Sequence, residues 1–140
     1  MFLIGVIFFN SMNMNTTNTL NVYGKPLMAC SFEPLTGFER DGFCKRNQLD
    51  SGTHILCACM TQEFLEYTKS RGNDLSTPIP HWNFPGLKPG DFWCLCISRW
   101  LQAVKAGKAP LLHLDACHAS ALTYTTIEVL EQYKYKAYTS

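Results

Sequence analysis

The chain is poor in charge and has no strongly basic segment. Charged residues make up 16% of its 140 positions, and 12 Lys and Arg against 11 Asp and Glu give a formal net charge of +1. Nowhere do three basic residues follow one another. Because proteins that neutralise a phosphate backbone concentrate Lys and Arg locally, we expect no nucleic-acid partner.

The chain also has no apolar run long enough to cross a bilayer. Residues 1–9 are apolar, whereas a membrane-spanning helix needs about 20 apolar residues. No Lys or Arg precedes this run and no small-residue cleavage site follows it, as a secretory signal would require. We therefore expect a cytoplasmic protein without a membrane partner. A degenerate signal or a membrane-surface tail is the alternative.

Cysteine is not scarce, but its number is odd. The 7 cysteines cannot all pair within one chain, and they fall below the density of disulfide-rich scaffolds. The absence of a secretory signal adds to this argument. We therefore expect free thiols in a reducing compartment.

The length favours one domain. Residues 10–21 are almost all Asn, Thr, Ser and Met and show no apolar periodicity. We expect residues 1–19 to be a flexible leader, or the product of a start assigned too early, and residues 20–138 to form a single globular domain.

Apolar periodicity predicts a small mixed fold. The expected strands are 20–23, 54–60, 92–97 and 111–114, and the expected helices are 61–71, 98–106 and 125–137. Thr61 is the expected cap of the first helix, and a capping box at 125–128 starts the last. This order predicts an α/β or α+β sandwich with three helices and a three- to five-stranded, partly parallel sheet.

A proline-rich connection joins the first helix to the second C-x-C strand. Residues 73–90 hold four prolines, a density that rules out a helix or a central strand. Loops of this length in compact domains often carry function, so we expect an ordered segment that lines or covers a cleft. A loop packed only on itself is the alternative.

Two C-x-C pairs, Cys57/Cys59 and Cys94/Cys96, lie on expected strands. Extended backbone places residues i and i+2 about 7 Å apart, whereas the sulfurs of a tetrahedral zinc site lie about 3.8 Å apart. We therefore expect no metal, and the simplest interpretation is that these cysteines are small buried side chains. A zinc-binding protein remains an alternative.

Thiol chemistry is another possibility, provided that a histidine lies near a cysteine in the fold. His54 and Cys57 are three apart on a strand and face opposite ways. His118 follows the last expected strand, where α/β sites commonly gather, although the simpler interpretation is a surface or helix-capping residue. The candidate catalytic residues are Cys94, Cys96 and His118.

A small polar ligand is a further candidate partner. Arg40 is expected to form an ion pair with Asp41 or Asp74, or alternatively to clamp an anion. The candidate binding residues are Arg40, Asp41, Cys44, Asn73, Asp74, Ser76 and Thr77. No motif identifies a cofactor or an oligomeric state.

Several strings together resemble a known bacterial family. They include TGFxRDGxC at 36–44, HxxCA at 54–58, GNDLSTP at 72–78, FPGLKPGD at 84–91 and WCLC at 93–96. The pattern covers about residues 20–137 and is similar to the family called domain of unknown function 2237. The resemblance implies a single domain and no particular reaction, and it implies Cys30, Cys44, Cys57, Cys94 and Cys96 with His54 and His118 as the shared set. It does not call for Cys59 or Cys117.

The expected function is therefore an uncharacterised small domain with a small-ligand or thiol-based site. A non-catalytic scaffold with buried structural cysteines is the alternative, beside the zinc protein.

Overall fold

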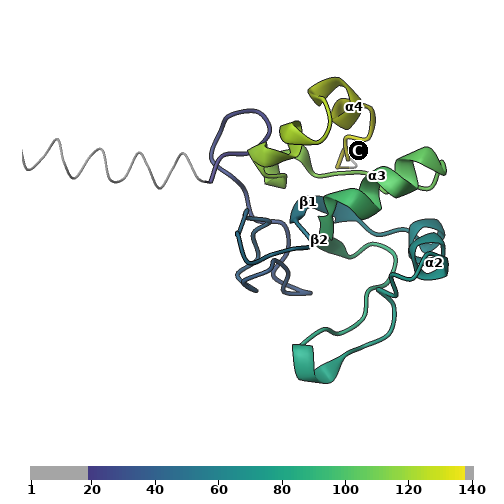
Figure 1. Cartoon of the computed structure of the whole chain (residues 1–140). Helices are drawn as coiled ribbons and strands as arrows, with labels where there is room; N and C mark the ends of the chain where they lie inside the picture. Colours follow the sequence, from purple (N-terminus) through teal and green to yellow (C-terminus); the bar gives the residue numbers. More distant parts are fainter. Residues whose placement is uncertain (1–18, 138–140) are drawn as a thin grey trace, which may run out of the picture.

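The structure, a computed structural model, describes residues 19–137, so the expected leader lies almost entirely outside the described residues (Figure 1). The fold is α+β. Its strands are β1 (His54–Cys59) and β2 (Phe92–Cys96), and its helices are α2 (Gln62–Ser70), α3 (Ile97–Lys105) and α4 (Ile127–Gln132). Three short 3-10 turns complete it: η1 (Pro80–Trp82), η2 (Leu114–Ala116) and η3 (Ala119–Thr123).

The two strands pair antiparallel, with Cys57 opposite Cys94 and Cys59 opposite Phe92. The long connection after α2 returns to the end of β1, where the Gly90 N–H donates to the Met60 carbonyl at 2.9 Å. β2 therefore starts where β1 ends and must run the opposite way. The expectation of a partly parallel sheet is wrong for this pair, since the connection brings the chain back to the same end of β1.

The expected third strand exists only as isolated pairing. Leu112 bridges Ala58 on one side and Lys134 on the other. Pro110 has no N–H to extend this pairing, and η2 begins at Leu114, so the segment is too short to form a strand. The described residues hold a two-stranded sheet, and the expected three to five strands are not confirmed.

The expected strand at 20–23 is also reduced to single bridges. Leu20 pairs with Pro26 and Asn21 with His118. Gly24 adopts φ +75°, which turns the chain back on itself after Tyr23. The segment is therefore a tight loop held against the η3 region.

The first two helices, α2 and α3, follow the sequence signals closely. Thr61 Oγ1 accepts a hydrogen bond from Phe64 N at 3.0 Å and caps α2 as expected. α3 buries Trp100, whose indole N–H donates to the Pro110 carbonyl at 3.1 Å. Trp100 also packs edge-on against Tyr133, their ring centroids 5.1 Å apart.

The last helix is shorter than expected. Thr126 caps α4, and the helix ends at Gln132 rather than near residue 137. Beyond it, Leu112 N donates to the Tyr133 carbonyl and Tyr135 N donates to the Leu112 carbonyl, both at 2.7 Å. This pairing needs extended backbone, which competes with the helix and stops it.

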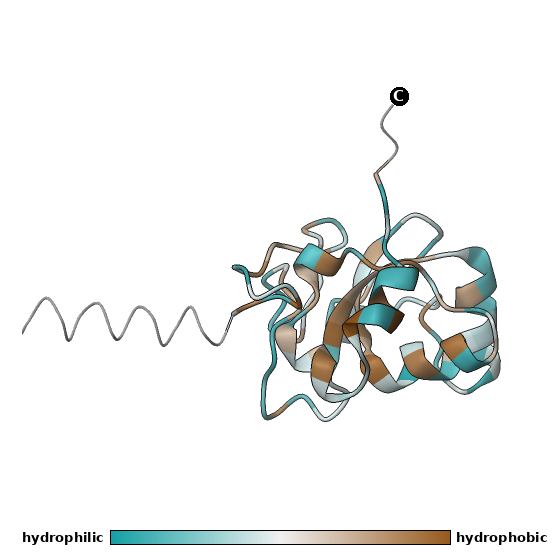
Figure 2. Cartoon of the chain, turned by 90° about the horizontal axis from the view of Figure 1, so that it is seen from above, coloured by the Kyte–Doolittle hydropathy of each residue, from teal (hydrophilic) through white to brown (hydrophobic). Residues whose placement is uncertain are grey.

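β1 lies at the centre of the core. Its residues Ile55 to Ala58 are fully buried, and Figure 2 shows the apolar strands in the middle of the molecule among helices and loops of mixed hydropathy. A strand buried on both faces reads as a continuous apolar run. Among the described helices, none has the length and apolar character needed to cross a membrane.

Candidate functional site

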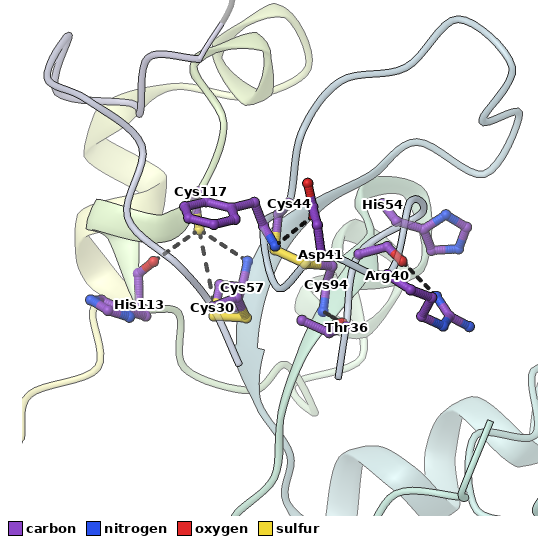
Figure 3. Close-up of a disulfide and its surroundings, with 12 residues drawn as sticks. Cys30, Thr36, Arg40, Asp41, Cys44, His54, Cys57, Cys94, His113 and Cys117 are labelled. Carbon is purple, nitrogen blue, oxygen red and sulfur yellow. Dashed lines mark hydrogen bonds between the residues drawn. A yellow bond between two sulfur atoms is a disulfide. The ribbon is translucent and has the colours of Figure 1, made fainter. Parts of the chain in front are cut away.

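Two disulfides join the irregular segment after residue 28 to the sheet. Cys30 is bonded to Cys57 on β1, and Cys44 is bonded to Cys94 on β2 (Figure 3). The expectation of free thiols is wrong for these four cysteines. An odd count excludes complete pairing only, and a segment with no helix or strand of its own benefits from covalent anchors.

The two disulfides lie against each other. Cys57 and Cys94 are register partners, and side chains of directly opposed residues share one face of a sheet. Their loop partners reach the same face, so the Sγ atoms of Cys30, Cys44 and Cys57 all lie within 4.8 Å of one another. A metal needs thiolates, and these sulfurs are bonded in disulfides. The expectation of no structural zinc stays a prediction.

The remaining three cysteines are free. Cys117 is fully buried, and its sulfur accepts a hydrogen bond from Cys57 N at 3.3 Å, beside the first disulfide. Burial raises the pKa of Cys117 to about 12, so this thiol stays protonated. Partial burial, with the charge of Asp91 adding to it, also raises the pKa of Cys59.

A cavity of about 580 Å³ opens beside the Cys44–Cys94 disulfide. It lies between the turn at 37–40, the proline-rich connection and β2. The lining residues are Gly37, Phe38, Arg40, His54, Asn73, Asp74, Leu75, Ile79, Trp82, Phe84, Trp93 and Cys94. We call this cavity the Arg40 pocket.

Arg40 is the cation of this pocket. Its guanidinium carbon lies 5.1 Å from the centroid of the Trp93 ring, and Nη1 donates to the Gly37 carbonyl at 2.6 Å. Its Nε is buried and has no hydrogen-bond partner among the described residues. Burial lowers the pKa of Arg40, but a guanidinium remains protonated in proteins.

The turn that presents Arg40 is specified locally. Gly37 has φ +98°, and a Cβ there would lie 2.5 Å from the Phe43 carbonyl oxygen, so only glycine fits. Arg40 itself has φ +54°, a region that side chains rarely adopt. Buried Thr36 fixes the turn to the sheet, because its hydroxyl accepts a hydrogen bond from Cys94 N at 2.8 Å.

The expected ion pair of Arg40 does not form among the described residues. Asp41 pairs instead with Lys45, whose Nζ lies 2.7 Å from its Oδ2. Asp74 closes its own turn: its Oδ1 accepts from Ser76 N at 2.9 Å, and its Oδ2 accepts from the Thr77 hydroxyl at 2.7 Å. Both carboxylates are therefore satisfied elsewhere, and Arg40 is left for another partner.

The pocket gathers part of the expected binding set. Arg40, Asn73 and Asp74 line it directly, and Cys44 is bonded to the lining residue Cys94. Ser76 and Thr77 donate hydrogen bonds that close the turn at Asp74, and Asp41 forms its ion pair with Lys45. The proline-rich connection contributes half of the lining, as expected of a segment beside a cleft.

The expected catalytic trio is distributed differently. Cys94 lines the Arg40 pocket, whereas Cys96 and His118 are not among its lining residues. The Cys96 sulfur lies 3.0 Å from the Ser98 hydroxyl. His118 is buried, and its Nδ1 accepts from Ser120 N at 3.0 Å and so caps η3, as one of the two interpretations expected. A shared reaction of the three stays a prediction.

Sequence reasoning missed the aromatic walls, and it considered His54 only as a partner of a cysteine, not as a residue of this pocket. Trp93 and Phe84 pack edge-on with centroids 5.3 Å apart, and His54 faces the pocket with its Nδ1 2.7 Å from Oδ1 of buried Asp50. The aromatic residues lie in or next to the strings FPGLKPGD and WCLC. Their density there was the available signal.

The chain is similar to a known protein family over most of its length. The family described as uncharacterized protein conserved in bacteria, DUF2237, matches residues 20–134. No curated protein matches the chain. Since the match spans nearly all of the described fold, with both disulfides and the pocket, the chain belongs to the DUF2237 family.

Proposed function

We propose that the Arg40 pocket binds a small ligand that joins an anionic group to an apolar body. The observation that carries this proposal is the state of Arg40, a partly buried cation whose Nε has no partner among the described residues. A buried donor without a partner costs about 1–3 kcal/mol. Arg40 also forms no ion pair among the described residues, and guanidinium groups bind carboxylates through paired hydrogen bonds, so a ligand carboxylate suits this cation.

The backbone at Arg40 supports the same function. A non-glycine residue at φ +54° is strained, and such strain is commonly retained at binding sites. The Trp93 ring beneath the guanidinium holds its plane in place. The side chain is thus positioned before a ligand arrives, which lowers the entropy cost of binding.

The apolar walls and the volume set the size of the ligand. Phe84 and Trp93 are buried, while Trp82 is 64% exposed and lies at the pocket rim. A cavity of about 580 Å³ lies within the range of small-molecule sites. Asp74 adds a negative charge to the lining, since hydrogen bonds from Thr77 and Ser76 lower its pKa. That charge disfavours ligands with several negative groups, so a monoanion fits best.

Tryptophan fluorescence tests the proposal, because Trp82 and Trp93 line the pocket. Benzoate serves as the anionic probe and benzyl alcohol as its neutral counterpart. We expect benzoate to bind and to lose at least ~10-fold in affinity in Arg40→Met, since a charged hydrogen bond contributes about 1.5–3 kcal/mol. Equal affinity of both probes, or unchanged benzoate binding by Arg40→Met, contradicts the proposal.

Arg46→Met is the matched control. Arg46 is exposed and bonds to the Asn47 carbonyl, away from the pocket lining. Its replacement removes the same charge from the same surface segment and leaves the pocket unchanged. We expect wild-type benzoate affinity in this variant.

A further inference from the structure

The four bonded sulfurs form a continuous path through the core. Cys94 lines the Arg40 pocket at one end, and its partner Cys44 lies beside Cys57 and Cys30. At the other end, Cys30 is partly exposed and lines a second cavity of about 430 Å³. Figure 3 shows the two yellow bonds between Arg40 on one side and His113 on the other.

We propose that these disulfides act as a relay for thiol–disulfide exchange, in which two small thiols at the Arg40 pocket supply two electrons and leave free thiols at Cys94 and Cys30. The choice of thiol rests on the proposed function, because the anionic group of that thiol would be held by Arg40. The exchange between the two disulfides rests only on the packing of their sulfurs. The substrate class is therefore a small thiol with a carboxylate.

The chemistry balances in three steps. The thiolate of the bound thiol attacks Sγ of Cys94, forms a mixed disulfide and displaces the Cys44 thiolate. The Cys44 thiolate then attacks Sγ of Cys57, forms a Cys44–Cys57 disulfide and displaces the Cys30 thiolate, which takes up a proton. A second small thiol attacks the mixed disulfide, which leaves Cys94 as a thiol and releases a small-molecule disulfide.

The sum consumes two small thiols and yields one small-molecule disulfide. The protein goes from two disulfides to one disulfide and two thiols, Cys30 and Cys94. The two protons of the small thiols end on these two cysteines. No other oxidant or reductant takes part.

In the second step, burial decides which sulfur of the Cys30–Cys57 disulfide leaves. Cys44 and Cys57 are fully buried, whereas Cys30 is partly exposed. A thiolate is costly in an apolar interior and is stabilised by solvent, so Cys30 is the better leaving group. Joining Cys44 to Cys57 keeps both buried sulfurs bonded and leaves the free thiols at the two cavities.

The neighbouring free thiol does not compete in this exchange. The Cys117 sulfur accepts a hydrogen bond from the backbone N–H of Cys57. The raised pKa of Cys117 keeps this thiol protonated, and only a thiolate attacks a disulfide. Cys59 and Cys96 are half-buried thiols outside the three-sulfur cluster. The path therefore runs through the two disulfides alone.

Mapping the partly reduced protein tests the relay. The full chain is treated with less than one equivalent of a phosphine reductant, quenched with acid, alkylated and analysed by peptide mass mapping. We expect a Cys44–Cys57 disulfide with label on Cys30 and Cys94. Three other products overturn the relay. The first is label on Cys44 and Cys94 with the Cys30–Cys57 disulfide intact, and the second is label on Cys30 and Cys57 with the Cys44–Cys94 disulfide intact. The third is a Cys30–Cys44 disulfide.

A second measurement guards against scrambling by the other thiols. The Cys59→Ser/Cys96→Ser variant removes the two half-buried free thiols and keeps all four relay sulfurs. We expect the same Cys44–Cys57 product from this variant. Its disappearance there would show that the exchange ran through Cys59 or Cys96 and would overturn the relay.

The pocket step has its own measurement. With 3-mercaptopropionate, we expect an early mixed disulfide on Cys94 that forms ~10-fold faster, relative to neutral 2-mercaptoethanol, in the wild type than in Arg40→Met. A Cys44–Cys57 product without this preference overturns the role of the pocket but keeps the exchange. If 3-mercaptopropionate is preferred at Cys94 but the Cys30–Cys57 disulfide stays intact, the relay is overturned and the role of the pocket stands.

Discussion

At the residue scale, Arg40 and Thr36 define the pocket. Thr36 is fully buried, and its hydrogen bond from Cys94 N fixes the turn to β2. Arg40 has a strained backbone conformation, and its guanidinium lies over the Trp93 ring. Lys45 draws Asp41 away from Arg40, which keeps the cation unpaired. These contacts fix the turn at the sheet, place the guanidinium over Trp93 and keep the Asp41 carboxylate on Lys45.

Thr36→Val tests the anchor of this turn. The substitution keeps the shape but leaves the Cys94 N–H buried without its acceptor, which costs about 1–3 kcal/mol of unfolding free energy. Urea unfolding measures the loss. Thr123→Val is the control, because Thr123 is exposed and its hydroxyl makes no hydrogen bond among the described residues. Equal stability of the two variants would contradict the anchoring role.

We expect the ionisation of Asp41 to make the free energy of unfolding slightly sensitive to acid. Burial raises its pKa, but the bonds from Lys45 and Phe43 N outweigh this and lower the pKa overall. A carboxyl with a depressed folded pKa contributes stability above its unfolded pKa of about 4 and loses it as the pH falls through the folded value. The side chain is 38% exposed, so we expect less than ~1 kcal/mol.

Urea unfolding at pH 7 and pH 3 measures this contribution. Asp41→Asn should lose less stability between the two pH values than the wild type, since it has no carboxyl to protonate. An equal loss in both proteins would remove Asp41 from the acid response.

At the scale of elements, the disulfides replace secondary structure. The segment 28–49 contains no helix or strand, and Cys30 and Cys44 tie it to β1 and β2. The long connection after α2 makes a second wall of the pocket and projects from the body, with η1 near its tip (Figure 1). Two irregular segments thus meet over a small sheet.

The Cys44→Ala/Cys94→Ala double variant tests the second anchor. The cross-link closes a loop of separation 50 in sequence, and removing such a bond costs typically about 2–4 kcal/mol. Urea unfolding measures the loss. Cys59→Ala/Cys96→Ala is the control and should cost about 1 kcal/mol or less per site, because these cysteines are only half-buried and carry no cross-link. Equal losses would deny the disulfide a structural role.

At the scale of the whole molecule, one core serves both cavities. β1 is buried on all sides, and the sulfur cluster lies between its face and the 28–49 segment. With disulfides and a buried apolar core, the fold has the means to be stable without a metal.

We therefore expect purified protein to contain no stoichiometric zinc and to keep its unfolding temperature in EDTA. Elemental analysis and thermal unfolding measure the two quantities. Stoichiometric zinc, or unfolding by the chelator, would show that Cys30, Cys44 and Cys57 bind metal as thiolates instead.

Local signals in the sequence determined those elements that depend on interactions between residues close together in the chain. Thr61 predicted the cap of α2, and the capping box at 125–128 predicted the start of α4 to within one residue, since Thr126 is the cap; a hydroxyl three residues before a free N–H needs no distant partner. The apolar run at 54–60 predicted β1, and the proline density predicted an irregular connection. These features depend on spacing within a few residues.

Only the tertiary structure decided the sheet direction, the cysteine pairs and the charge of the pocket. The direction of β2 depends on where a long connection returns, and the partners of Cys57 and Cys94 come from residues 27 and 50 positions away. Arg40 forms no ion pair among the described residues because Lys45 and Thr77 bind the two carboxylates that the sequence offered it. Such competition is settled by distances in space, which sequence spacing does not contain.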